Sequence, residues 1–189
     1  MYPQLQAHLL KDINFTPSEV QEFISILKHQ KLNKKDLLIQ PGDKVTHEHY
    51  VLKGCLKAYY LDKNGQMHII QFAVEDWWIS DFEAFFNEKP AQLFVECLEN
   101  SELLSLDKVA LEKLYTRIPK FERFFRIKVT KAFVALRNRI LSSLQKDSKT
   151  RYVEFCKQYP SLQGRIANYH IANYLGMTPE SLSRIRKTI

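Results

Sequence analysis

The segment from residue 120 to residue 145 contains neither glycine nor proline and carries two apolar stripes at helical spacing. As one continuous helix it would rise about 39 Å, which is longer than a single small domain can cover. We therefore expect one stripe to pack on the chain's own core and the other to pair with the same helix of a second copy. A helix buried within one monomer is the alternative. The stripe expected in the dimer contains Phe125, Val129, Phe133, Leu136, Ile140 and Leu144, and the other contains Phe124, Ile127, Val134 and Leu141.

The part of the chain before this helix reads as a series of short β-rich runs. Between residues 36 and 106 these runs alternate with turn signals such as the Asp-Lys-Asn-Gly of residues 62–65, a pattern typical of a small antiparallel roll. Helices are predicted on either side of the roll. The capping signature of residues 16–19 predicts a helix over 17–29, and Asp107 is placed to cap another. The expected fold class is α+β.

Two short helices joined by a tight turn are predicted in the last run of the chain, GRIANYHIANYLGMTPESLSRIRKTI, which begins at residue 164. Gly176 permits the turn, and the Thr-Pro-Glu of residues 178–180 is placed to cap the second helix. Leu182 and Ile185 would fill the angle between the helices, as a helix-turn-helix requires. An ordinary helical hairpin with a solvated basic face is the alternative.

The second of these helices carries side chains suited to nucleic-acid recognition. Glu180 could accept a hydrogen bond from cytosine N4, and Arg184 could donate two hydrogen bonds to guanine. Basic and phenolic side chains nearby suit phosphate groups. The predicted base-reading residues are Thr178, Glu180, Ser181 and Arg184, and the predicted phosphate contacts are Arg165, Tyr169, Arg186 and Lys187.

The excess positive charge of the chain lies in its last third. Residues 128–189 carry 12 Lys and Arg against three acidic residues, a net charge of +9, whereas residues 1–127 carry a net charge of −2. Such a basic segment usually meets a polyanion, because each Lys or Arg placed on a phosphate releases condensed counterions. A solvated helical surface is the alternative reading.

Several classes of protein are disfavoured by the composition. No run of about 18 apolar residues and no signal peptide are present, so we expect a cytoplasmic protein without a membrane span. The three cysteines, Cys55, Cys97 and Cys156, are spread apart and expected to be free thiols. Catalytic motifs are missing, and neither a metal nor a cofactor is predicted. The His47-x-His49 pair is expected in an exposed polar turn and not at a metal.

The order of these parts, a β-roll with VLKG and a DKNGQ hairpin, a long helix and then TPESLSRIRK, resembles the Crp/Fnr family of transcriptional regulators. The resemblance implies a cyclic-nucleotide-binding-type jelly roll over residues 1–118, a dimerisation helix over 119–146 and a helix-turn-helix DNA-binding domain over 147–189. It implies double-stranded DNA and a second copy of the chain as partners, with RNA polymerase a further candidate. Since the sequence ends at Ile189, we expect no full β-hairpin wing within it. Either the DNA-binding domain is naturally wingless, or the sequence stops before the wing.

The motifs of the family are matched unevenly. The E-x-x-x-R spacing that often reads bases in the family is reproduced by Glu180 and Arg184, but the residue before the Glu, an Arg in the cyclic AMP receptor protein, is Pro179. We therefore expect a different operator. An iron–sulfur cluster of the fumarate-nitrate regulator type is not expected, because no cysteine precedes Cys55.

The ligand pocket departs further from the family pattern. Ser80-Asp81 falls on the Gly-Glu pair that holds the ribose hydroxyl, and Ala91-Gln92 falls on the Arg-Ser pair that holds the cyclic phosphate. A buried phosphate without a basic partner is costly, so the protein is not expected to respond to cyclic AMP. The competing hypothesis to a DNA-binding regulator is a dimeric sensor of a small molecule or protein that does not bind DNA effectively.

Overall fold

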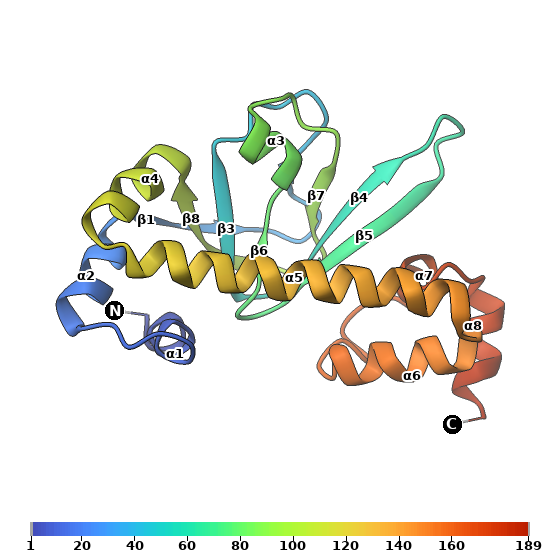
Figure 1. Cartoon of the computed structure of the whole chain (residues 1–189). Coiled ribbons are helices and arrows are strands. Elements are labelled where there is room, and N and C mark those ends of the chain that lie inside the picture. The colour runs from blue at the N-terminus through green and yellow to red at the C-terminus, as the bar shows by residue number, and fades with distance from the viewer. Residues whose placement is uncertain (1, 189) are drawn as a thin grey trace. The chain divides into compact units, whose positions relative to one another are not determined.

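The computed structural model describes residues 2–188 and confirms the α+β fold class (Figure 1). The helices are α1 (Pro3–Leu10), α2 (Pro17–Ser25), α3 (Phe82–Asn87), α4 (Lys108–Arg117), α5 (Lys120–Gln145), α6 (Ser148–Gln158), α7 (Asn168–Tyr174) and α8 (Pro179–Arg186). The strands are β1 (Leu27–Leu32), β2 (Leu37–Ile39), β3 (His47–Lys53), β4 (Leu56–Leu61), β5 (Met67–Ala73), β6 (Trp78–Ile79), β7 (Phe94–Cys97) and β8 (Ser101–Asp107).

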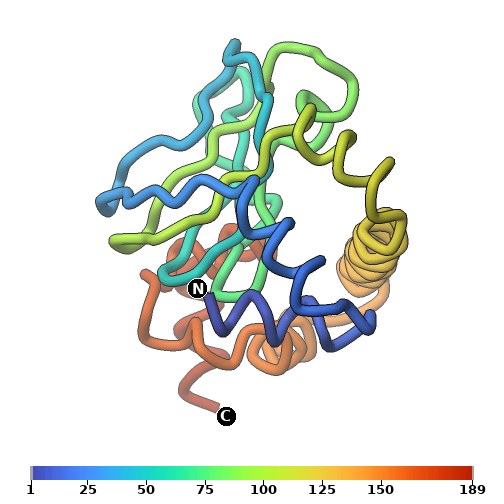
Figure 2. The backbone as a smooth tube through the Cα atoms, turned by 90° about the vertical axis from the view of Figure 1, so that its left-hand side faces the viewer, coloured from blue at the N-terminus to red at the C-terminus, as the bar shows by residue number. Residues whose placement is uncertain are grey.

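The strands form two four-stranded sheets in the orders β1-β8-β3-β6 and β2-β7-β4-β5. Figure 2 follows the chain from blue to green as these strands wind into a roll. Val51 and Leu103 of the first sheet share one buried apolar cluster with Ala58 and Val95 of the second. Because side chains alternate between the faces of a strand, this cluster accounts for only half of the residues of each strand.

A second core lies on the other face of β3 and β8. Tyr50, Leu104 and Leu106 join apolar side chains of α1, α2, α4 and the start of α5 in this core. Phe121 of α5 stacks on Phe23 of α2, with ring centroids 4.8 Å apart. The two central strands are therefore covered on both faces, and nearly all of their residues are buried or half-buried, the polar ones included.

Contacts divide the chain into two compact units. Unit 1 comprises the described residues up to Tyr60 together with Gln71–Lys128. Unit 2 comprises Leu61–Ile70 and the described residues from Val129 onward. The tip of the β4–β5 hairpin thus belongs to the same unit as the C-terminal helices, and α5 contributes to both units. The boundaries expected from the sequence at residues 118 and 146 stay predictions.

Two local predictions are wrong. The helix expected over residues 17–29 ends at Ser25, because the backbone from Leu27 onward pairs with β8, with Leu27 opposite Leu106. The expected polar turn around His47 and His49 is part of strand β3, in which His49 lies opposite Ser105 of β8. In both places pairing with a strand distant in the sequence overrides the local signal.

The long helix is confirmed with the predicted limits. Helix α5 runs over 26 residues without interruption. Within residues 2–188, no helix combines the length and the apolar character that crossing a membrane requires.

Candidate functional site

Helices α7 and α8 form the predicted helix, tight turn and helix. Gly176 adopts a positive φ of 63°, and the Met177 backbone N–H donates to the Ala172 carbonyl at 3.0 Å, so the first helix is closed by a left-handed residue. The Thr178 hydroxyl then accepts a hydrogen bond of 3.2 Å from the Ser181 backbone N–H and caps α8. Leu182 is fully buried and anchors α8 to the rest of unit 2.

The C-terminal end of α7 is held by an arginine that no sequence motif indicated. Arg151 of α6 donates a hydrogen bond of 2.6 Å to the Leu175 carbonyl, which places a positive charge at the negative end of the α7 dipole. Beneath α7, the rings of Phe155, Tyr159 and Tyr174 pack with centroids 5.1–6.0 Å apart. These ring contacts pack α7 against α6 and the segment that follows α6. The sequence offered only one indication of the contact with the Leu175 carbonyl, a basic residue, Arg151, in the helical region that precedes α7.

The predicted base-reading residues lie together on the open side of α8. Thr178, Glu180 and Arg184 are exposed and Ser181 is half-buried. Arg184 donates a hydrogen bond of 3.3 Å to the Ser181 hydroxyl, so its side chain is directed along the helix. The backbone N–H of Glu180, the Thr178 side chain and the charge of Arg184 hold the pKa of the Glu180 carboxyl below its usual value. Glu180 is thus ionised at neutral pH and can act only as a hydrogen-bond acceptor.

The predicted phosphate contacts are less uniform. Tyr169, Arg186 and Lys187 are exposed, whereas Arg165 is half-buried. Arg186 also donates to the Asn168 side chain, which ties the end of α8 to the start of α7. Helix α8 ends at Arg186, and Ile189 lies outside the described residues, so the expected absence of a wing stays a prediction.

Most of the predicted dimer stripe forms an exposed apolar row on α5. The exposed fractions are 54% for Val129, 65% for Phe133, 49% for Leu136, 52% for Ile140 and 77% for Leu144. From Val129 to Ile140 the spacing of four, three and four residues corresponds to alternating core positions of a coiled coil. A row of this length on one helix is unusual for a surface that faces only water.

Phe125 does not belong to this row. It is only 8% exposed and packs edge-on against Trp78, with ring centroids 5.3 Å apart, inside the core of unit 1. The predicted inclusion of Phe125 in the dimer stripe is therefore wrong. Phe125 and Val129 are four residues apart, as the stripe requires. The same spacing also occurs where a helix passes from the buried core of its domain, at Phe125, to an exposed surface, at Val129.

The predicted ligand pocket is built around Asp81. One of its oxygens, Oδ1, accepts a hydrogen bond of 3.2 Å from the Ala84 backbone N–H and caps α3. The other, Oδ2, accepts hydrogen bonds from the backbone N–H groups of Gln92 at 2.8 Å and Leu93 at 3.0 Å. Asp81 is 2% exposed, so its carboxylate is occupied by the backbone of its own domain.

The other three pocket residues also serve the fold. Ser80 is buried and donates a hydrogen bond of 3.0 Å to the His47 carbonyl. Ala91 is buried, while Gln92 is exposed and contributes its backbone N–H to Asp81. The structure thus brings these four residues together. The side chains of Ser80 and Asp81 hydrogen-bond to the protein's own backbone, and none of the four residues is basic.

Strand β3 buries two titratable groups on opposite faces. His49 shares hydrogen bonds with Ser105 at 3.0 Å and Gln30 at 3.3 Å, and burial, with a smaller effect of His47, lowers its pKa to about 3. Glu48 is 5% exposed, and burial raises its pKa to about 8. Both groups are therefore neutral at pH 7. Among residues 2–188, no three histidine, cysteine or acidic side chains are grouped closely enough to hold a metal ion.

Comparison with known proteins finds one domain family and several regulatory proteins to which this chain is similar. The family model for the cyclic nucleotide-binding domain matches residues 29–117. The Anaerobic regulatory protein of Aggregatibacter actinomycetemcomitans is 23% identical, with 88% of this chain and 69% of that protein aligned. The solved structure of FixK2 from Bradyrhizobium japonicum is similar with a TM-score of 0.74 and 16% identity, covering 86% of this chain and 84% of that one. The c-di-GMP responsive global regulator CLP from Xanthomonas campestris gives a TM-score of 0.71 and 13% identity, covering 92% and 91%.

Proposed function

Because this chain carries a cyclic nucleotide-binding domain and is a distant homologue of the Crp/Fnr transcriptional regulators, we propose that it is a sequence-specific DNA-binding regulator. In this proposal two copies bind a palindromic operator, and each places α8 in the major groove, about 34 Å from its mate. The curated relatives are named as regulatory proteins, and in this proposal the chain has no catalytic activity of its own.

The observation that carries the proposal is the division of α8 into two faces. Leu182 is fully buried against unit 2, whereas Glu180 and Arg184, one helical turn apart, are exposed on the side away from it. A recognition helix needs such an arrangement, because one side must hold the helix firmly while the other reaches base edges. An ionised Glu180 suits the amino group of cytosine, and the guanidinium of Arg184 suits guanine O6 and N7.

The charge of unit 2 supports the same partner. All of the excess positive charge of the chain lies between residues 128 and 189. Within this segment Lys187 is exposed next to the end of α8, where it could meet a phosphate. Binding should therefore weaken steeply as salt is raised.

The exposed row on α5 supports a homodimer. A second copy of the same helix offers the same apolar side chains in the same spacing, so a parallel pair would bury Val129, Phe133, Leu136 and Ile140 of both copies. The two-fold symmetry of such a pair matches the two-fold symmetry of a palindromic operator.

The protein is proposed to act without cyclic AMP. The acidic group that the family pattern places at the ribose is Asp81, and its two oxygens already accept three backbone hydrogen bonds. No Lys or Arg takes the place of the phosphate-binding residue at Ala91-Gln92. Addition of cyclic AMP should therefore shift neither the melting temperature nor the affinity for DNA.

The proposal is tested by fluorescence anisotropy on DNA fragments from upstream of the protein's own coding region, titrated with salt. We expect Arg184→Ala to cost about 1–3 kcal/mol and to relax selectivity at one base position. Lys187→Ala is the matched variant, since it should weaken binding to all sequences alike and reduce the salt slope by about one.

Two results would contradict the proposal. An equal loss on specific and random DNA for Arg184→Ala would remove the base-reading role. A dimer that ignores duplex DNA at moderate salt, but gains melting temperature with a metabolite, would instead support the sensor hypothesis.

A further inference from the structure

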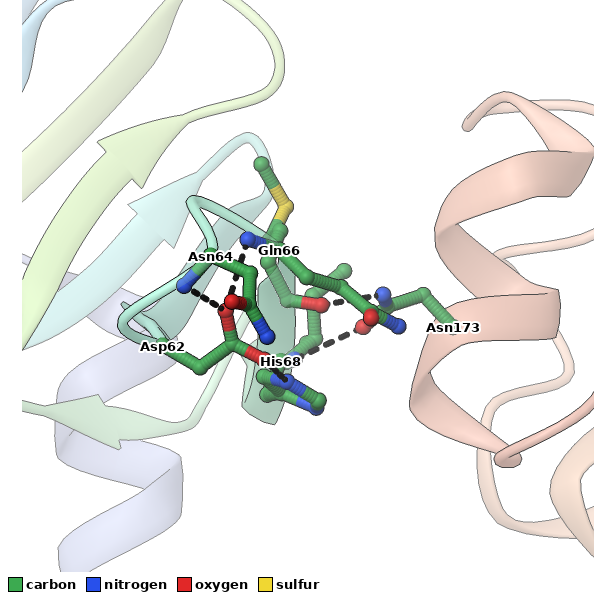
Figure 3. A network of polar contacts seen from close by, with 7 residues as sticks. Asp62, Asn64, Gln66, His68 and Asn173 are labelled. Atoms are coloured by element: carbon green, nitrogen blue, oxygen red, sulfur yellow. Dashed lines mark hydrogen bonds and ion pairs between the residues drawn. The ribbon is translucent and has the colours of Figure 1, made fainter.

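The tip of the β4–β5 hairpin is bound to α7 through one asparagine. Asn173 of α7 donates a hydrogen bond of 2.6 Å from Nδ2 to the Met67 carbonyl, and its Oδ1 accepts one of 2.8 Å from the Ile69 backbone N–H (Figure 3). The side-chain amide thus pairs with the backbone of the tip as a neighbouring strand would. Both polar ends of Asn173 are used, so the contact is specific for an amide at this position.

The tip is held in its conformation by hydrogen bonds of its own. The Asp62 carboxylate accepts hydrogen bonds from the backbone N–H groups of Asn64 at 2.8 Å and Gln66 at 3.0 Å, and it lies 3.1 Å from Nε2 of His68 (Figure 3). Gly65 supplies the left-handed residue that the turn needs, with a φ of 77°. A tip ordered in this way can hold a helix in a defined direction.

Arg139 of α5 also binds both the hairpin and α7. It donates hydrogen bonds to the carbonyls of Ile69 at 3.1 Å and Tyr174 at 3.0 Å, and also to the carbonyl of Ile70. Its guanidinium lies 3.8 Å from the centre of the Tyr174 ring. One side chain therefore links α5, the hairpin tip and the C-terminal end of α7, and it stabilises that end of the helix by its charge.

We propose that Asn173 and Arg139 are positioning residues that set the direction of the α7–α8 pair relative to α5. This inference rests on the proposed function. In a dimer built on α5, the separation of the two recognition helices depends on how each helix pair is attached to α5, and α8 follows α7 because the two helices pack together. The contact would thereby determine which spacing between operator half-sites the dimer accepts.

The first test measures the contact without DNA. Amide hydrogen exchange of Ile69 reports its bond to Asn173, so Asn173→Ala should accelerate that exchange while the exchange of buried Leu182 stays unchanged. Asn138→Ala, at an exposed asparagine on α5, is the matched control. Unchanged exchange of Ile69 in Asn173→Ala would overturn the proposal at its first step.

The second test measures affinity for a panel of palindromic operators whose half-site spacing changes by single base pairs. The wild type should prefer one spacing, and Asn173→Ala and Arg139→Ala should flatten that preference by about tenfold. Arg139→Lys keeps the charge but not the set of directed donors, so it should behave like the alanine variant. Arg184→Ala should weaken all spacings by the same factor and keep the preference.

The outcomes separate this inference from the proposed function. Faster exchange of Ile69 with an unaltered spacing preference would show that the contact exists but does not position the helices. A wild-type protein that binds every fragment equally would overturn the proposed function and the spacing role together, whatever the exchange of Ile69 shows.

Discussion

The Asp81 carboxylate accepts a hydrogen bond of 2.8 Å from the Gln92 backbone N–H, which joins the start of α3 to the segment before β7. Removing the acceptor leaves buried N–H groups without a partner, which costs about 1–3 kcal/mol for each group. Asp81→Ala should therefore lower the free energy of unfolding by about 3 kcal/mol. Asp81→Asn should lose less, because its one amide oxygen can take the place of Oδ2 and accept from both Gln92 and Leu93, so that only the Ala84 N–H loses its acceptor. Denaturant unfolding tests both variants, with the exposed Glu83→Ala as control.

The pH dependence of stability should carry the signature of Glu48. Its pKa is raised to about 8 by burial, against an ordinary value of 4.5. Between these values the folded chain keeps a proton that the unfolded chain loses, so Glu48 makes stability fall by about 1.4 kcal/mol per pH unit as pH rises. Glu48→Gln should remove this slope between about pH 5 and pH 7.5 in urea titrations. Retention of the slope would mean that Glu48 ionises normally.

Two glycines with positive φ should respond differently to alanine. A Cβ at Gly54, where φ is 107°, would collide with Ser101, including its backbone. Gly65 has a φ of 77°, and a Cβ added there would meet nothing within 4 Å, so only backbone strain of about 1 kcal/mol opposes the substitution. Gly54→Ala should therefore lower the melting temperature several degrees more than Gly65→Ala. Equal losses would contradict the close approach of Gly54 to Ser101.

The proposed dimer should depend on the apolar row of α5 and not on apolar exposure in general. Leu136→Lys places a charge in the centre of that row and should weaken self-association by about 100-fold or more. Val109 of α4 is more exposed than Leu136, at 60% against 49%, so Val109→Lys is a stringent control. Sedimentation velocity over a range of protein concentrations distinguishes the two. Equal dimerisation of both variants would place the interface elsewhere.

The sequence predicted best the features that depend on neighbouring residues. The starts of α2, α4 and α8 are marked by side chains that accept from the backbone three residues later: Thr16, Asp107 and Thr178. Such caps are local and can be seen in a short window of sequence. The uninterrupted run of α5 was predictable for the same reason.

Features that depend on distant pairing were missed. The strand that begins at Leu27 exists because β8, about 70 residues or more away along the chain, offers its edge. Asp81 matched a family position for a ligand, but its role in the fold became visible only when Gln92 was brought next to it. The role of Asn173 was not predictable, because a lone asparagine on a short helix has no distinctive sequence pattern until the hairpin tip lies beside it.

The membership of Leu61–Ile70 in unit 2 has a consequence for recombination between regulators. A gene fusion that grafts residues from Val129 onward onto a foreign sensor would leave behind the carbonyls that Arg139 and Asn173 bind. A single crossover therefore cannot transfer the α7–α8 pair together with all of its contacts. A working chimaera would need the β4–β5 hairpin and the C-terminal helices from the same parent protein.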